Sequence, residues 1–135
     1  MFEYSGSRLV KGIANNGERN AMLETFLLHA RCLYDFLYPS KKIRKDDVLA
    51  DDFFDDSSEL RKTLPQRLAI SSYLKHRTGK EVAHITYTRL KVGPMQKQWQ
   101  VPEVHNQIGE AMAIFFETLT EEKRGWFRKV YVKRC

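Results

Sequence analysis

An arginine and a histidine stand seven positions apart in the stretch HRTGKEVAH, residues 76–84. The guanidinium of Arg77 offers a planar fork that matches a phosphate, and the imidazole of His84 titrates near neutral pH. Such a pair could cut RNA without a metal ion, because the ribose 2′-OH can attack the adjacent phosphorus while the histidine moves a proton. On a continuous helix the two side chains would share a face about 10 Å apart, and Gly79 could break the helix and bring them closer.

The spacing alone adds little weight to this pair. With 11 arginines, four histidines and three permitted spacings, about one match is expected by chance, and one is found. His29 could support the site, although a histidine among apolar neighbours on a helix is usually a hydrogen-bonded core or interface residue. His76 would be rotated about 100° from Arg77, and Arg89 could add a second phosphate contact.

Hydrophobic periodicity predicts that helices position these residues. Apolar residues recur every three or four positions over residues 16–38, after a capping asparagine and before a proline. A second helix is predicted over residues 65–77 and a third over residues 102–123, each with proline in its first turn. Residues 81–90 fit a helix or a strand, and we favour the helix. The predicted fold is an all-α bundle of three to four main helices with short connections.

Length and composition predict one domain over residues 1–135, with its core at about 16–120 and a basic aromatic tail at 121–135. No apolar run approaches the ~18 residues that span a bilayer, and the N-terminus lacks the apolar middle of a signal peptide. Two cysteines exclude a disulfide framework and a cysteine-rich zinc cluster. We therefore expect a cytoplasmic protein without a cofactor, a metal site or a membrane contact.

The net charge of +6 is unevenly distributed. Residues 46–59 hold seven acidic groups and no Lys or Arg, which leaves 23 basic against 10 acidic residues, or +13, elsewhere. This acidic segment misses the alternating oxygens and the glycine of a calcium loop. We expect one or two short helical turns with a solvated acidic face, and the alternative is a contact with a basic partner.

Cations alternate with aromatic rings near the C-terminus. Phosphates need cations and bases need flat rings, so this pattern is typical of a nucleic-acid surface, and the alternative is a solvated, partly frayed tail. The predicted nucleic-acid-binding residues are Lys123, Arg124, Trp126, Arg128, Lys129, Lys133 and Arg134.

The order of elements resembles small bacterial proteins of the HEPN type. The resemblance is based on the helix with FLLHARCLYDFLY, the acidic stretch, and the later basic helix with AHITYTR, and it covers about residues 16–120. The resemblance implies a helical bundle in which the Arg-x(4–6)-His pair, here Arg77 and His84, forms a metal-independent ribonuclease site across a homodimer. A polar Asn, Asp or His commonly follows the motif arginine, whereas Thr78 and Gly79 follow here, which weakens the assignment of activity.

Two functional hypotheses follow. The first is a homodimeric endoribonuclease of a toxin–antitoxin or antiphage system, with RNA as substrate and a cognate antitoxin as partner. The second is a non-catalytic accessory subunit that binds RNA or another protein, because members of the resembled group that lack the site have such roles.

Overall fold

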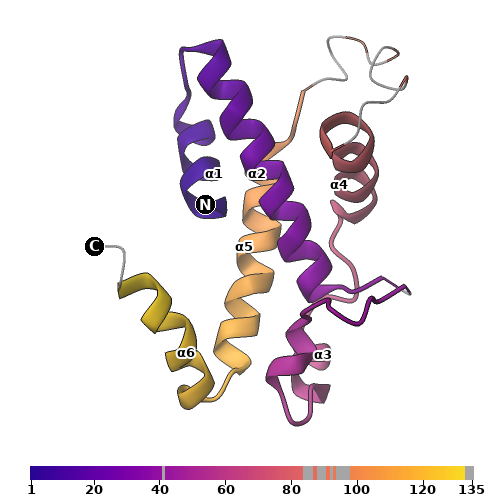
Figure 1. Ribbon diagram of the computed structural model, residues 1–135, viewed down its shortest axis with the longest axis vertical. Helices are drawn as coiled ribbons and strands as arrows, with labels where there is room; N and C mark the ends of the chain where they lie inside the picture. The colour runs from indigo at the N-terminus through magenta and orange to yellow at the C-terminus, as the bar shows by residue number, and fades with distance from the viewer. Residues whose placement is uncertain (41, 84–86, 88–90, 92, 94–97, 133–135) are drawn as a thin grey trace.

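The computed structural model describes residues 1–40, 42–83, 87, 91, 93 and 98–132, and the structural statements below concern these residues. They form six α-helices and two shorter helical segments, η1 and η2, and they include no strand (Figure 1). The predicted all-α class is confirmed, although the helices outnumber the three to four that were expected. No helix in these ranges is long and apolar enough to cross a membrane.

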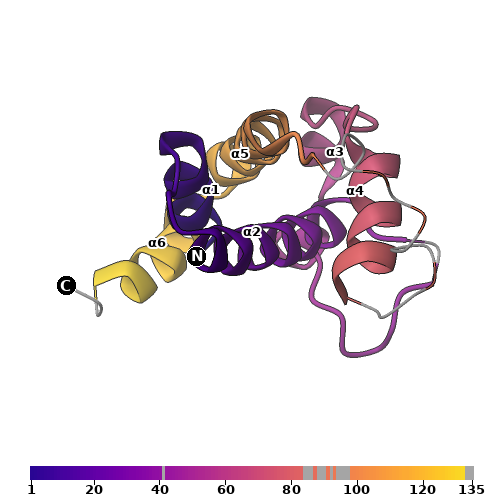
Figure 2. The ribbon, with the colours of Figure 1, turned by 90° about the horizontal axis from the view of Figure 1, so that it is seen from above.

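Helices α2 (Asn16–Leu37) and α5 (Val101–Thr118) pack together at the centre of the bundle (Figures 1 and 2). The side chain of Asn15 accepts a hydrogen bond from the backbone N–H of Glu18 at 3.0 Å, which is the predicted cap. Each helix buries one apolar stripe, as its periodicity predicts. The buried residues are Phe26, Leu27, Ala30, Tyr34 and Leu37 on α2, and Val104, Ile108, Ala111 and Phe115 on α5.

Helix α1 (Phe2–Lys11) was not predicted from the sequence, and it packs against both α2 and α5. The ring of Phe2 is buried and stacks on Phe26 with 5.0 Å between centroids. On α5, the ring of His105 packs beside both of these rings and contacts Glu3 of α1 through Nε2 at 2.9 Å. The core therefore begins at residue 2 and not near residue 16.

Gly6 lies where α1 closely approaches α2 and α5, so the direction in which its substitution changes stability can be predicted. A Cβ at this position would lie 2.6 Å from Cδ2 of His105 and 3.0 Å from Cε2 of Phe26, whereas a Cβ at Gly109 of α5 would meet nothing within 4 Å. Alanine gains about 1 kcal/mol over glycine inside a helix, but overpacking costs about 1–3 kcal/mol. We expect Gly6→Ala to lower the free energy of unfolding by about 1 kcal/mol and Gly109→Ala to raise it by about 1 kcal/mol, measured by urea denaturation. Equal effects of the two variants would contradict the close approach.

The acidic segment forms the short turns that were expected. It contains η1 (Ala50–Phe53), a 3₁₀ helix, and leads into α3 (Ser58–Thr63). Asp51 binds Arg61 through both carboxylate oxygens, and Arg61 also donates to the carbonyl of Leu37 at the end of α2. Burial alone would raise the pKa of Asp51, but hydrogen bonds from Arg61 and Ser57 outweigh it and lower the pKa below its ordinary value. Arg61 therefore connects Asp51 of the acidic segment to the end of α2.

Helix α4 (Ser71–Arg77) begins later than the predicted start at residue 65. Leu64 and Pro65 are not helical, while Leu68 and Ile70 turn into the core before α4 starts. The backbone N–H of Ile70 donates to Oε1 of Gln107 at 3.3 Å, so a side chain of α5 supplies a bond that a longer helix would have made itself. At Thr78 the chain continues as the π-helix η2 (Thr78–Ala83), and Gly79 does not end the helical path. A helix was expected over residues 81–90. The chain is helical through Ala83, and most of the residues that follow in this range lie outside the described residues.

Helix α6 (Glu121–Val132) follows α5 after a short turn, and its C-terminal end points away from the bundle (Figures 1 and 2). Phe127 fixes its first half, with ring centroids 5.2 Å from Phe116, 5.4 Å from Phe53 and 5.9 Å from Phe115. The segment predicted as a tail over residues 121–135 is thus a helix as far as Val132.

Candidate functional site

Arg77 is the residue of the predicted pair that the structure describes, and its guanidinium is held by several groups. Nε and Nη2 donate to the two carboxylate oxygens of Glu81, each at 2.8 Å. Nη1 donates to the Tyr73 hydroxyl at 3.2 Å and to the backbone carbonyl of Gln98 at 3.0 Å. The planar fork that could bind a phosphate is therefore occupied by a carboxylate of the same chain.

Two aromatic rings also contact Arg77. The guanidinium carbon lies 4.1 Å from the centroid of Trp99 and 5.0 Å from that of Tyr73, which are cation–π distances. The two rings pack edge to face, and the Tyr73 hydroxyl also accepts the backbone N–H of Gln100 at 3.0 Å. Arg77 thus joins the end of α4 to the segment that leads into α5.

The charge of Arg77 is stabilised and largely compensated where it stands. The hydrogen bonds that Arg77 donates to Glu81 raise the pKa of Arg77 above its ordinary value and outweigh partial burial, which acts in the opposite direction. The side chains of Arg77 and Glu81 are each 15% exposed. A phosphate would have to displace a bidentate carboxylate to reach this guanidinium, so the described geometry is that of a structural ion pair.

The π-helix η2 begins directly after Arg77. Thr78 is 1% exposed, and its hydroxyl has no hydrogen-bond partner among the described residues. From α2, Arg31 donates to the carbonyl of Lys75 at 2.9 Å and to Asp35 at 2.7 Å. Arg31 therefore forms an ion pair within α2 and also satisfies a carbonyl near the C-terminal end of α4.

The remaining residues of the predicted site do not gather around Arg77 in the described part of the chain. His29 is exposed on α2 and bonds through Nδ1 to the carbonyl of Thr25 at 2.8 Å, so it does not lie in the core, and its role at an interface stays a prediction. His76 is exposed on α4. His84 and Arg89 lie outside the described residues. The structure therefore describes one half of the predicted pair.

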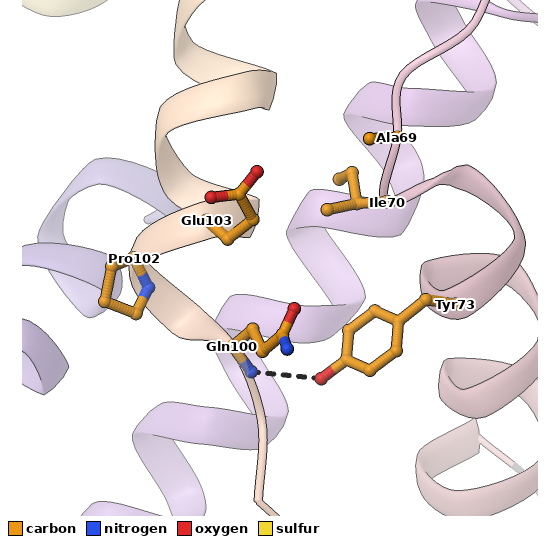
Figure 3. Close-up of a pocket in the computed structure, with 6 residues that line it drawn as sticks. All are labelled: Ala69, Ile70, Tyr73, Gln100, Pro102 and Glu103. Atoms are coloured by element: carbon orange, nitrogen blue, oxygen red, sulfur yellow. Dashed lines mark hydrogen bonds between the residues drawn. The ribbon is translucent and has the colours of Figure 1, made fainter.

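A cleft of about 520 Å³ opens between the start of α4 and the start of α5 (Figure 3). Sequence reasoning did not identify it, because its walls come from segments about 30 residues apart. Its lining residues are Ala69, Ile70, Tyr73, Gln100, Pro102 and Glu103. The aliphatic groups and the tyrosine ring make it mainly apolar, and Glu103 is the carboxylate among these described lining residues.

At the base of α6, the first two predicted nucleic-acid-binding cations hold the helix in place. Lys123 contacts Asp55 of the acidic segment at 3.4 Å. Arg124 donates to the carbonyls of Leu119 at 2.8 Å and Glu117 at 3.4 Å. Both residues therefore bind groups of their own chain.

The other predicted nucleic-acid-binding residues lie further along the same element. Trp126 is 49% exposed. Arg128 and Lys129 stand on the second half of α6, and Lys133 and Arg134 lie outside the described residues.

Three acidic residues of segment 46–59 stabilise local turns. Asp47 accepts the backbone N–H of Arg44, and Asp52 accepts that of Leu49, both at 2.8 Å. Asp56 accepts the backbone N–H of Ser58 at 2.9 Å. Short side chains that bond their own backbone in this way favour turns and helix starts, so the acidic composition has a local structural cause.

Comparison of the chain with protein-family models, with curated proteins and with solved structures finds no match. The HEPN-type resemblance stays a prediction, based on the order and pattern of the helices.

Proposed function

We propose that this chain is a non-catalytic helical protein that binds RNA through α6. The observation that carries the proposal is the placement of this helix. It is fixed to the bundle at its base, and the half that bears Arg128 and Lys129 extends away from the other helices (Figure 1). Residues 121–135 contain six Lys or Arg and two Glu, a net charge of +4, and α6 itself holds four of these cations and both acids, a net charge of +2. A projecting cationic helix can approach a phosphate backbone without moving the core.

The contacts of Arg77 support the non-catalytic form of this proposal. An arginine that already bonds Glu81, Tyr73 and Gln98 contributes to folding, and its use on a phosphate would break those contacts. The chance frequency of the Arg–His spacing points in the same direction. A homodimer and a cognate partner protein remain predictions, to be tested by the mass of the protein in solution and by co-purification.

The proposal predicts salt-dependent RNA binding that is lowered by changes in α6. With a fluorescently labelled 12-nucleotide RNA, we expect Arg128→Ala/Lys129→Ala to weaken binding about tenfold at 50 mM salt and to reduce the salt slope by about 1–2. The double variant Lys42→Ala/Lys45→Ala removes the same charge from an exposed loop and should change affinity by less than about twofold. Fluorescence anisotropy measures both quantities. Equal losses in the two double variants would show that net charge alone drives binding, and an absence of binding at 50 mM salt would refute the proposal.

The ribonuclease hypothesis is tested with the same protein and RNA. It requires cleavage in EDTA, products with cyclic phosphate ends, and loss of cleavage in His84→Ala with the fold intact. These three results together would replace the non-catalytic proposal. RNA that stays intact while it binds α6 would support the proposal.

A further inference from the structure

Trp126 is a large aromatic side chain that the fold leaves at the surface. It is 49% exposed, while its chain neighbour Phe127 packs among the phenylalanine rings that fix α6. Trp99, the other tryptophan of the chain, is covered by the guanidinium of Arg77 at 4.1 Å. Half-exposed tryptophans on charged elements are typical of binding surfaces, because they offer a rigid apolar face with few rotatable bonds.

Helix geometry places Trp126 in a stripe that differs from the anchoring face. At 100° per residue, Glu122, Trp126 and Lys129 fall within an arc of about 60°. Phe127 and Arg124, which hold the helix to the bundle, are centred about 160° away from the middle of that arc. Glu122 and Trp126 are exposed on the side of α6 away from the anchoring contacts, and Lys129 occupies the next position of the same helical stripe.

We infer that α6 binds single-stranded nucleic acid, with one base stacked on the ring of Trp126 and an adjacent phosphate at Lys129. This inference rests on the proposed function and adds the class of ligand. Trp126 and Lys129 are about 4.5 Å apart along the helix axis, so one nucleotide can reach both. The bases of a duplex are stacked on one another and present edges to a protein, whereas an unpaired base has a free face for an aromatic ring.

Glu122 gives the site a direction. It stands one turn before Trp126 at the base of α6, where its carboxylate would repel a phosphate. The strand would therefore extend from Trp126 toward the tip of the helix and not toward the bundle. We expect Glu122→Gln to raise affinity about twofold at low salt, because it removes one repulsive charge about 10 Å from the phosphates.

Tryptophan fluorescence tests the stacking directly. In Trp99→Phe, whose folding is checked by circular dichroism, Trp126 is the one tryptophan left. Titration with an unstructured single-stranded 12-mer should quench at least about half of its emission, and the same sequence as a duplex should bind about tenfold more weakly. The reciprocal variant Trp126→Phe retains Trp99 beneath Arg77, and its emission should change little.

Affinity measurements separate the failure of this inference from the failure of the proposed function. Trp126→Ala should weaken single-strand binding about tenfold and Trp126→Phe only slightly, since phenylalanine can still stack. Tyr4→Ala removes a comparably exposed ring from α1 and should have no effect. Binding with Trp126 unquenched, with Trp126→Ala unchanged, or with equal affinity for the duplex would overturn the inference and leave RNA binding by α6 in place. An absence of binding to either form would overturn both.

Discussion

Replacing Arg77 by alanine should lower the free energy of unfolding by about 3 kcal/mol and Tm by about 10 °C. Arg77 and Glu81 bind each other through two hydrogen bonds with only 15% of each side chain exposed, so alanine leaves a mostly buried carboxylate without its partner. The substitution also removes the cation from the ring of Trp99 and the donor from the carbonyl of Gln98. Urea denaturation followed by circular dichroism measures the change.

The Arg8–Glu18 pair provides a matched control on the same molecule. It joins the same residue types at 2.6 Å, but its side chains are 46% and 43% exposed. We expect Arg8→Ala to leave the free energy of unfolding nearly unchanged, because water screens an exposed pair. Arg77→Lys keeps the charge but loses the fork, and it should fall between the wild type and Arg77→Ala. If Arg8→Ala and Arg77→Ala have equal effects, the structural role given to Arg77 is wrong.

The structural role of Arg77 affects what a loss of activity in its variants would mean. Replacing a structural arginine lowers any activity because it destabilises the protein. Loss of RNA cleavage in Arg77→Ala is therefore not evidence for catalysis. A catalytic arginine would instead lose cleavage with Tm unchanged. Glu81→Gln separates the two cases further, because it frees the guanidinium from its carboxylate and would enhance phosphate binding only if Arg77 has access to RNA.

The elements that were predicted correctly from the sequence are those whose signals are local. Helix α2 has a capping asparagine, an apolar stripe and a terminating proline, all within 25 residues. The i,i+4 spacing of Arg77 and Glu81 was also visible and would have indicated an ion pair. The second helix was placed too early because the Gln107 side chain, 37 residues away, determines how the chain turns at Ile70. No local pattern contains that bond.

Helix α1 was missed for a related reason. Ser5 and Gly6 are poor helix formers, which disfavours a helix in the first ten residues. In the structure, the Ser5 hydroxyl bonds the carbonyl of Met1 at 2.8 Å, and Gly6 permits the approach of His105. Tertiary packing thus favours the helix where intrinsic propensity opposes it. The same holds for Arg77, whose environment depends on Trp99 and Gln98, more than 20 residues further along the chain.

Replacing Phe115 by alanine is expected to have the largest effect on stability, a loss of about 4 kcal/mol. Phe115 is fully buried on α5, and its ring contacts five other phenylalanines at 5.1–5.9 Å between centroids, mostly edge to face. They are Phe36, Phe53, Phe54, Phe116 and Phe127, and they come from α2, the acidic segment, α5 and α6. Alanine would leave a cavity at the point where these elements meet.

Because Phe115 also supports Phe127, the same substitution should loosen α6 more than the rest of the bundle. Hydrogen exchange should become faster in the first half of α6 in Phe115→Ala, with a smaller change in α1, whose contacts lie at the other end of α5. Phe116→Ala, a partly buried neighbour that contacts Phe115 and Phe127, should lose about half as much stability. Uniform acceleration of exchange along the chain would mean that the six rings stabilise the whole bundle and do not specifically anchor α6. Faster exchange confined to α6 would instead show that the six rings hold α6 in place. Phe115→Ala should then weaken RNA binding by α6, although every cation is still present.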